Sequence, residues 1–327
     1  MRKLSVGILM GGPSAEHEIS LLSGKAFLSN LNPDRYIAYP ILISKNGGWF
    51  LRGKRIPPEE ALRHIDVALL ALHGEFGEDG RLQAFLEHHG VSYTGSAVVS
   101  SALGMDKLAS RSIFRADGLR VPATAAFDKD EIGQNSKLSQ KRIFQLCGKG
   151  PWMVKPKSRG SSVGVSFVRT PSAFSGAFKK AFRFESQLLV EEYLGGTEVT
   201  VPILERNGKP EVLPLVEIRP RKSLFFDYKE KYGGEDGAEE IIPARISRRI
   251  AVLAAEAGLA AYKLLACRGY ARVDMILVHD RPYVLEANTL PGMAPVSLFP
   301  KAAKAAGVEF PGLLDILIEN ALRKGGE

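Results

Sequence analysis

The segment from Tyr270 to Asn288 constrains the fold more strongly than any other part of the chain. Two apolar runs, YARVDMILV and PYVLEAN, flank the short polar stretch His279-Asp280-Arg281, a pattern that predicts a β-hairpin. If those three residues form the loop, side-chain alternation gives the hairpin two different faces. One face then carries the polar residues Arg272, Asp274, Glu286 and Asn288. The other carries the apolar residues Val273, Met275, Leu277, Leu285 and Ala287.

The polar face of this hairpin predicts a site for a hard divalent cation. Asp274 and Glu286 would lie opposite each other, and facing carboxylates repel unless something lies between them. Mg²⁺ prefers oxygen ligands and keeps positions for water and phosphate, whereas zinc is disfavoured because no His or Cys accompanies the acids. Two alternatives stay open: a four-residue loop would slip the register and place one acid outside, and the strand could fray into a solvated turn.

Composition narrows the class of protein. The chain has 327 residues, enough for two or three domains, with 45% hydrophobic and 24% charged residues. The net charge of +8 comes from Lys and Arg scattered among Asp and Glu, which favours small anionic ligands over nucleic acid. No apolar run approaches the roughly 20 residues of a membrane helix. The pair Cys147 and Cys267, without CxxC spacing or a signal peptide, favours the reduced cytoplasm.

The first third alternates short apolar runs with helical patterns. Strands are expected at residues 4–10, 38–44 and 66–72, with a helix after Ser14, the expected N-cap, and another ending at Gly90. This alternation predicts a parallel, doubly wound, Rossmann-like α/β domain over residues 1–106.

The rest of the chain reads as α+β. A central unit, 107–194, combines a helix over 107–117 with strands at 152–155 and 163–168, and its polar stretch around residues 128–142 reads as loop and helix start. The last unit, 195–327, holds long antiparallel strands, a charged loop over 227–240, and helices over 247–266 and 313–322.

The stretch VKPKSRGSSVGVSFV predicts a phosphate-binding bend. Lys155 ends one strand, and the small residues 160–164 allow backbone N–H groups and hydroxyls to approach a phosphate. The chain has neither GxxxxGK[ST] nor GxGxxG, so a Walker motif is excluded and dinucleotide binding is weakly supported. Alone, the bend is more typical of a tight hairpin turn than of a phosphate site. Together with Lys107 and the acidic hairpin, it favours a nucleotide.

Taken together, these segments resemble the D-alanine–D-alanine ligases of the ATP-grasp superfamily. The resemblance covers nearly the whole chain. Its motifs are GGPSAEHEISLLSG, HGEFGEDGRLQ, GMDKLASR, VKPKSRGSSVGVS, EEYLGGTEVTV, DYKEKY, YARVDMIL and LEANTLPGMAPVSL. It implies two ATP-grasp subdomains that sandwich ATP, ATP-dependent joining of two D-alanines for a peptidoglycan precursor, and a cytoplasmic homodimer.

The resemblance also implies roles for individual residues. ATP would be bound by Lys107, Lys155, Gly160, Ser161, Ser162, Val163, Glu191, Glu192, Tyr193, Leu194, Glu198, Lys231 and Asn288. Two Mg²⁺ ions, or Mn²⁺, would be bound by Asp274, Glu286 and Asn288. The two D-alanines would be bound by Glu16, His73, Lys231, Arg272, Gly292, Ser297 and Leu298. Arg272 and the Gly292 N–H would form an oxyanion hole, and Glu16, Ser161 and Tyr232 a hydrogen-bonded chain closing the loop 227–240 as a mobile lid.

Some residues depart from the family pattern. Leu290, Ala294 and Val296 differ near the second substrate, and Glu192 differs in the adenine region. None of these positions supplies a charged catalytic group, so they bear on pocket shape rather than on the reaction.

Overall fold

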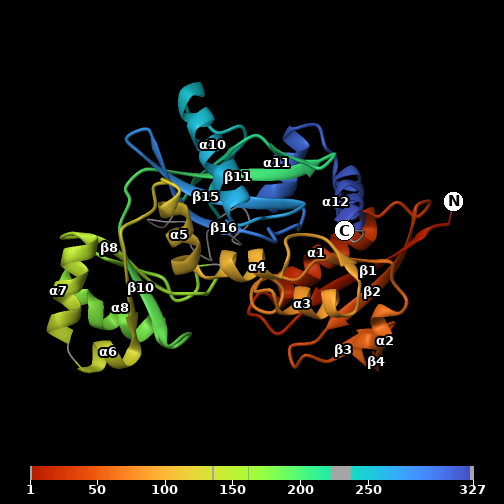
Figure 1. Ribbon diagram of the computed structural model, residues 1–327, viewed down its shortest axis with the longest axis horizontal. Helices are drawn as coiled ribbons and strands as arrows, with labels where there is room; N and C mark the ends of the chain where they lie inside the picture. The colour runs from red at the N-terminus through yellow and green to blue at the C-terminus, as the bar shows by residue number, and fades with distance from the viewer. Residues whose placement is uncertain (1, 135, 161, 222–236, 325–327) are drawn as a thin grey trace.

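A computed structural model describes residues 2–134, 136–160, 162–221 and 237–324. These residues form three sheets, which lie at the right, the lower left and the top of Figure 1. Ser161, Lys231 and Tyr232 lie outside the described residues, as does most of the expected lid, 227–236. None of the described helices is long and apolar enough to span a bilayer.

The first sheet is the predicted doubly wound domain. Its strands in spatial order are β4 (Lys54–Ile56), β3 (Trp49–Leu51), β2 (Tyr36–Ile43), β1 (Leu4–Gly11), β5 (Val67–Leu70) and β6 (Ser92–Tyr93). β1, β2, β5 and β6 run parallel, whereas β3 and β4 add an antiparallel edge. The accompanying helices are α1 (His17–Asn30), α2 (Pro58–Leu62), α3 (Arg81–His88) and α4 (Val98–Met105).

The predicted N-cap of α1 was wrong. The helix begins at His17 after Glu16, and Ser14 stands two residues too early to cap it. The Ser14 hydroxyl instead donates to the His73 carbonyl at 2.6 Å and accepts the Glu16 N–H at 3.1 Å. Ser14 therefore ties the turn after β1 to the turn after β5, where two predicted substrate residues lie.

The central sheet is antiparallel throughout. Its strands in spatial order are β7 (Thr124–Asp128), β10 (Gln187–Glu192), β8 (Trp152–Pro156) and β9 (Ser166–Val168). Its helices are α6 (Lys129–Gln134), α7 (Ser136–Cys147) and α8 (Phe174–Ala181), the last preceded by a 3₁₀ turn, Pro171–Ala173.

Two expectations for this central unit need correction. The polar stretch expected as loop and helix start is helical over most of its length, forming α6 and the start of α7, because Ile132 and the buried Ile143 pack on the core around Trp152. The strand expected from residue 163 begins at Ser166, since residues 163–165 belong to the turn.

The third sheet carries the hairpin. Its strands in spatial order are β14 (Glu239–Ile241), β13 (Val216–Arg219), β11 (Thr197–Arg206), β15 (Tyr270–Val278) and β16 (Arg281–Asn288), and β12 (Lys209–Val212) also pairs with β11. Part of the expected loop is therefore strand, because Glu240 pairs with Ile218. The remaining helices are α5 (Lys107–Ala116), α10 (Arg248–Leu264), α11 (Leu298–Ala305) and α12 (Phe310–Lys324).

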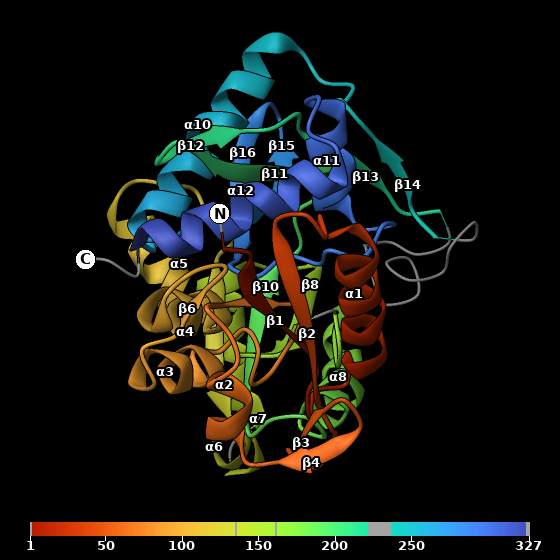
Figure 2. The same ribbon diagram turned by 90° about the vertical axis from the view of Figure 1, so that its right-hand side faces the viewer.

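Packing links the sheets across the chain. α5 contributes Phe114 to the core of the third sheet, together with residues of α10. α11 and α12 return to the core of the first sheet, where Leu317 and Phe299 pack with β1 and β5 residues. Figure 2 shows α12 between the third sheet and the N-terminal domain, with α11 beside the third sheet. The third sheet is thus held on both sides, and its hairpin faces the space between the units.

Two helix glycines give opposite expectations for stability. A Cβ at Gly258 of α10 would lie 2.7 Å from the Cγ1 of the buried Val201, whereas a Cβ at Gly176 of α8 meets nothing within 4 Å. Alanine gains up to about 1 kcal/mol of helix propensity over glycine, but overpacking costs about 1–3 kcal/mol. We expect Gly258→Ala to lower the Tm and Gly176→Ala to raise it slightly. A rise in the Tm of Gly258→Ala in thermal unfolding would contradict this close packing.

Candidate active site

The hairpin has the predicted pairing but a different turn. His279 and Asp280, with φ values of 45° and 62°, form a two-residue loop rather than the expected three-residue loop. A register shift follows between Asp274 and Met275, because Leu285 is an extra residue on β16. The bulge restores the expected register, so Asp274 faces Glu286 and Arg272 faces Asn288.

Because of the same bulge, the apolar face of the hairpin differs from the predicted one. Leu285 was expected in the core with Val273 and Met275, but it lines a pocket beside Glu286. Val284 takes the core position opposite Met275, and both are fully buried. The bulge therefore turns one apolar side chain into the site and keeps both carboxylates there.

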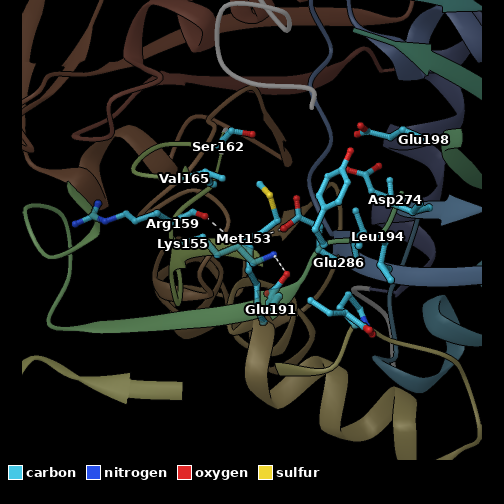
Figure 3. A pocket seen from close by; sticks show the side chains of 17 residues that line it. Met153, Lys155, Arg159, Ser162, Val165, Glu191, Leu194, Glu198, Asp274 and Glu286 are labelled. Carbon is cyan, nitrogen blue, oxygen red and sulfur yellow. Dashed lines mark hydrogen bonds and ion pairs between the residues drawn. The ribbon is translucent and has the colours of Figure 1, made fainter. Parts of the chain in front are cut away.

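A nucleotide-sized pocket lies between the central sheet and the hairpin (Figure 3). Nine predicted ATP residues line it: Lys107, Lys155, Gly160, Ser162, Glu191, Glu192, Tyr193, Leu194 and Glu198. Val163 is not among the lining residues, whereas Val165 is, and Asn288 lines the neighbouring pocket instead. Met153, Ile276 and Leu285 add an apolar lining suited to a flat ring.

A buried ion cluster forms one wall of this pocket. The Glu191 carboxylate contacts the Arg111 guanidinium with one oxygen and the Lys155 ammonium, at 2.7 Å, with the other. Burial alone would raise the pKa of Glu191, but the charges of Arg111 and Lys155 hold it below its usual value. Burial, reinforced by Arg111, lowers the pKa of Lys155 to about 8. Arg111 was missed in the sequence, although it lies in the quoted motif GMDKLASR.

The hairpin carboxylates are each neutralised by a cation. Lys107 lies 3.2 Å from Glu286. Asp274 accepts hydrogen bonds from Thr200 at 2.6 Å, and from Arg272 and Asn288 at 3.0 Å each. No group of three or more His, Cys, Asp or Glu side chains suited to a metal occurs in the described part of the chain. Two carboxylates and one amide nevertheless form an all-oxygen donor set that fits Mg²⁺.

A second pocket adjoins the first. The predicted residues Glu16, His73, Arg272, Gly292, Ser297 and Leu298 line it. Glu78 and Glu240 line it as well and were assigned no role from the sequence, although Glu78 lies in the motif HGEFGEDG. The departures Leu290, Ala294 and Val296 also face this pocket.

Backbone geometry shapes both ends of the second pocket. At one end, a Cβ on Gly74 would lie 2.9 Å from Glu16 Oε2, so a side chain there would displace this carboxylate. At the other end, Ser297 precedes the first residue of α11, and its hydroxyl makes no capping bond. A Cβ on Gly292 would lie 3.1 Å from that hydroxyl. A helix N-terminus with an adjacent hydroxyl suits a carboxylate.

His73 is held between the N-terminal helix and an acid. Its Nε2 lies 2.9 Å from the Ser23 hydroxyl, and its Nδ1 lies 3.8 Å from Glu78. His73 as a whole is 4% exposed, so the orientation of its ring is set by these partners.

Comparison with known proteins decides the family. Models described as the D-ala D-ala ligase N-terminus and C-terminus match residues 5–59 and 51–96, and residues 113–319. A D-alanine–D-alanine ligase of Pelotomaculum thermopropionicum is 40% identical over 99% of this chain and 98% of its own. The chain belongs to the D-alanine–D-alanine ligase family.

Solved structures confirm the predicted fold class for this D-alanine–D-alanine ligase family member. The Bacillus anthracis ligase complexed with ATP has a TM-score of 0.80 at 33% identity, covering 99% of each chain. The VanG D-Ala:D-Ser ligase of Enterococcus faecalis has a TM-score of 0.83 at 30% identity, covering 98% of this chain and all of its own.

The buried Lys155 makes stability depend on pH. Below about pH 8, Lys155 is protonated in both the folded and the unfolded chain, and the full cost of burying the cation is present. Between pH 8 and 10.5 the unfolded chain keeps a proton that the folded chain releases, so stability rises with pH, by up to about 3 kcal/mol.

Lys155→Met isolates this contribution. We expect the Tm of the wild-type protein, relative to that of Lys155→Met, to increase between pH 7.5 and 10. The exposed Lys304, 73% accessible, provides the control, since Lys304→Met should show no such trend. A Tm difference that is flat or falls with pH would contradict the lowered pKa of Lys155.

Proposed function

We infer that the protein catalyses the ATP-dependent ligation of two D-alanines, forming D-alanyl-D-alanine, ADP and phosphate for peptidoglycan precursor synthesis. The observation that carries this inference is the shared wall of the two pockets. Gly160 lines both, and a small cavity lined by Lys107, Glu286 and Asn288 shares residues with each. A phosphate held on one side can therefore meet a carboxylate held on the other.

The first chemical step activates a carboxylate, because carboxylates do not react with amines at neutral pH. One carboxylate oxygen of the first D-alanine attacks the γ-phosphorus, and the bond from that phosphorus to the ADP oxygen breaks. Lys107 and Lys155 neutralise the phosphate charge and orient the phosphoryl group. Glu16 accepts the ammonium of the first D-alanine.

The second step forms the peptide bond. The amine of the second D-alanine attacks the acyl carbon, phosphate leaves, and the amine proton is lost. Arg272 and the Gly292 N–H stabilise the oxyanion, an effect of about 3–4 kcal/mol in comparable sites. Ser297 binds the second carboxylate at the N-terminus of α11.

The hairpin residues Asp274, Glu286 and Asn288 would hold two Mg²⁺ ions, with Mn²⁺ as a substitute. Such ions would supply charge neutralisation for the phosphates of ATP. Lys107 and Arg272 contact the same carboxylates, and bound nucleotide and metal would redistribute these contacts.

Further proposals concern the organisation of the enzyme. The three units would be residues 1–106, 107–194 and 195–327, acting in the cytoplasm as a homodimer. The part of the expected lid that precedes β14, residues 227–238, would close over the site with Lys231 on the second carboxylate and Tyr232 bonded to Ser161 and Glu16. A lid is required because water would hydrolyse the acyl phosphate.

The hairpin carboxylates give a direct test of the metal proposal. Asp274→Asn and Glu286→Gln should each lower kcat by about 100-fold or more, because each removes a charge from the phosphate-neutralising site while keeping its shape. Asp280→Asn, on the exposed turn of the same hairpin, is the matched control and should stay fully active. Full activity of either site variant with an unchanged Mg²⁺ requirement would refute the assignment.

Substrate choice tests the proposed function itself. ADP release should require D-alanine, and D-alanyl-D-alanine should be the main product when D-alanine, D-serine and D-lactate are supplied together. Because a D-Ala:D-Ser ligase is among the similar structures, D-alanyl-D-serine is the alternative main product. A predominant D-alanyl-D-serine or depsipeptide product, resolved by mass spectrometry at pH 6 and pH 8, would overturn D-alanine as the second substrate.

A further inference from the structure

Arg111 occupies an unusual position for an arginine. It lies on α5 one helical turn after Lys107, so both side chains share one face of the helix. Its side chain is only 2% exposed, and Nη2 is buried without a hydrogen-bond partner among the described residues. Leaving a buried donor unpaired is costly, so the contacts of the remaining guanidinium nitrogens must fix this side chain.

Those contacts join both sheets that flank the nucleotide pocket. From the central sheet, Arg111 contacts Glu191 on β10 and donates to the Thr124 hydroxyl on β7 at 3.3 Å. Glu191 and Thr124 are directly paired across the two strands, so their polar side chains are neighbours and both contact the guanidinium. From the third sheet, Arg111 Nε donates to the Leu285 carbonyl at 2.8 Å.

The Leu285 contact depends on the bulge. Leu285 has no partner in the ladder with β15, so its carbonyl needs a hydrogen-bond donor from elsewhere. Arg111 supplies that donor to the peptide unit that directly precedes Glu286. The guanidinium thus supports the backbone from which the Glu286 carboxylate projects toward the pocket.

The Glu191 contact reaches the phosphate-facing lysine. Lys155 and Glu191 lie on neighbouring strands with their charged groups 2.7 Å apart (Figure 3). Arg111, Glu191 and Lys155 together carry one net positive charge. Without Arg111, the remaining pair would be neutral, and Glu191 would be held by Lys155 alone.

We propose that Arg111 is a positioning residue for the nucleotide: through Glu191 it holds Lys155 toward the phosphates, and through the Leu285 carbonyl it holds the backbone at Glu286. The inference rests on the proposed function only in naming the phosphates of ATP as the ligand.

A double-mutant cycle on nucleotide binding separates this role from a structural ion pair. The probe is Mg–ADP binding measured by calorimetry without any amino acid. Arg111→Met and Glu191→Gln should each raise the Kd at least tenfold. Because both residues act through Lys155, the effects of the two substitutions should not multiply. The Kd of the double variant should be at most about twofold higher than the Kd of the single variant that binds Mg–ADP more weakly. At saturating ATP, the KM for D-alanine in Arg111→Met should change less than twofold.

Two further variants keep the test decisive. If Arg111→Met does not fold, Arg111→Lys is the alternative, because it retains the charge but loses the several N–H donors of the guanidinium. Arg111→Lys should still raise the Kd at least threefold. The control is Arg35, another forked arginine, which pairs with Asp315 at 2.6 Å and Glu319 at 2.9 Å far from the pocket. Arg35→Lys should lower the Tm and leave the Kd within twofold of wild type.

Several results would overturn the proposal. These are an unchanged Kd in a folded Arg111 variant, losses that multiply in the double variant, an equal rise in the KM for D-alanine, or an equal loss of binding in Arg35→Lys. If the wild-type protein binds Mg–ADP and ligates D-alanine, and the Arg111 variants have the same Kd, the role of Arg111 is refuted but the proposed function stands. If the wild-type protein does not bind Mg–ADP, the proposed function fails with it.

Discussion

The bulged hairpin of β15 and β16 is the constraint on which the site depends. A strand pair with a period of two can place Asp274 and Glu286 on one face only if the register is correct. The two-residue turn at His279 and Asp280 alone would offset that register by one residue, and the extra residue at Leu285 compensates. Each pocket is then built against one part of the same polar face.

Charge balance explains how such a polar face is tolerated inside the protein. Three carboxylates at the junction each have a cationic neighbour: Lys107 for Glu286, Arg272 for Asp274, and Arg111 with Lys155 for Glu191. Buried ion pairs of this kind add little net stability compared with apolar packing. Their arrangement around a nucleotide-sized space is therefore better explained by ligand binding than by folding.

Much of the fold could be predicted because its signals are local. The apolar runs of β1 and β5 and the alternation of β15 and β16 are properties of short stretches. The motifs around Glu16, Lys155 and Ser297 likewise carry the family resemblance, and the structure brings these residues to the two adjoining pockets.

The remainder depends on contacts between distant segments. Ile143 lies within the largely polar sequence of α6 and α7, and its burial could not be predicted because it depends on the strands around Trp152. The bulge at Leu285 becomes visible only when the turn and the opposing strand are placed together, and the role of Arg111 requires three strands from two sheets. Glu240, expected in a loop, is a strand residue because β13 is available to pair with it.

The central claim is that a carboxylate of the first D-alanine attacks the γ-phosphorus before the peptide bond forms. Ligation of D-alanine labelled with ¹⁸O in both carboxylate oxygens tests this most directly, with the released phosphate analysed by mass spectrometry. The account predicts that each phosphate carries one ¹⁸O atom taken from the carboxylate. Phosphate released without ¹⁸O, alongside normal dipeptide formation, would contradict it.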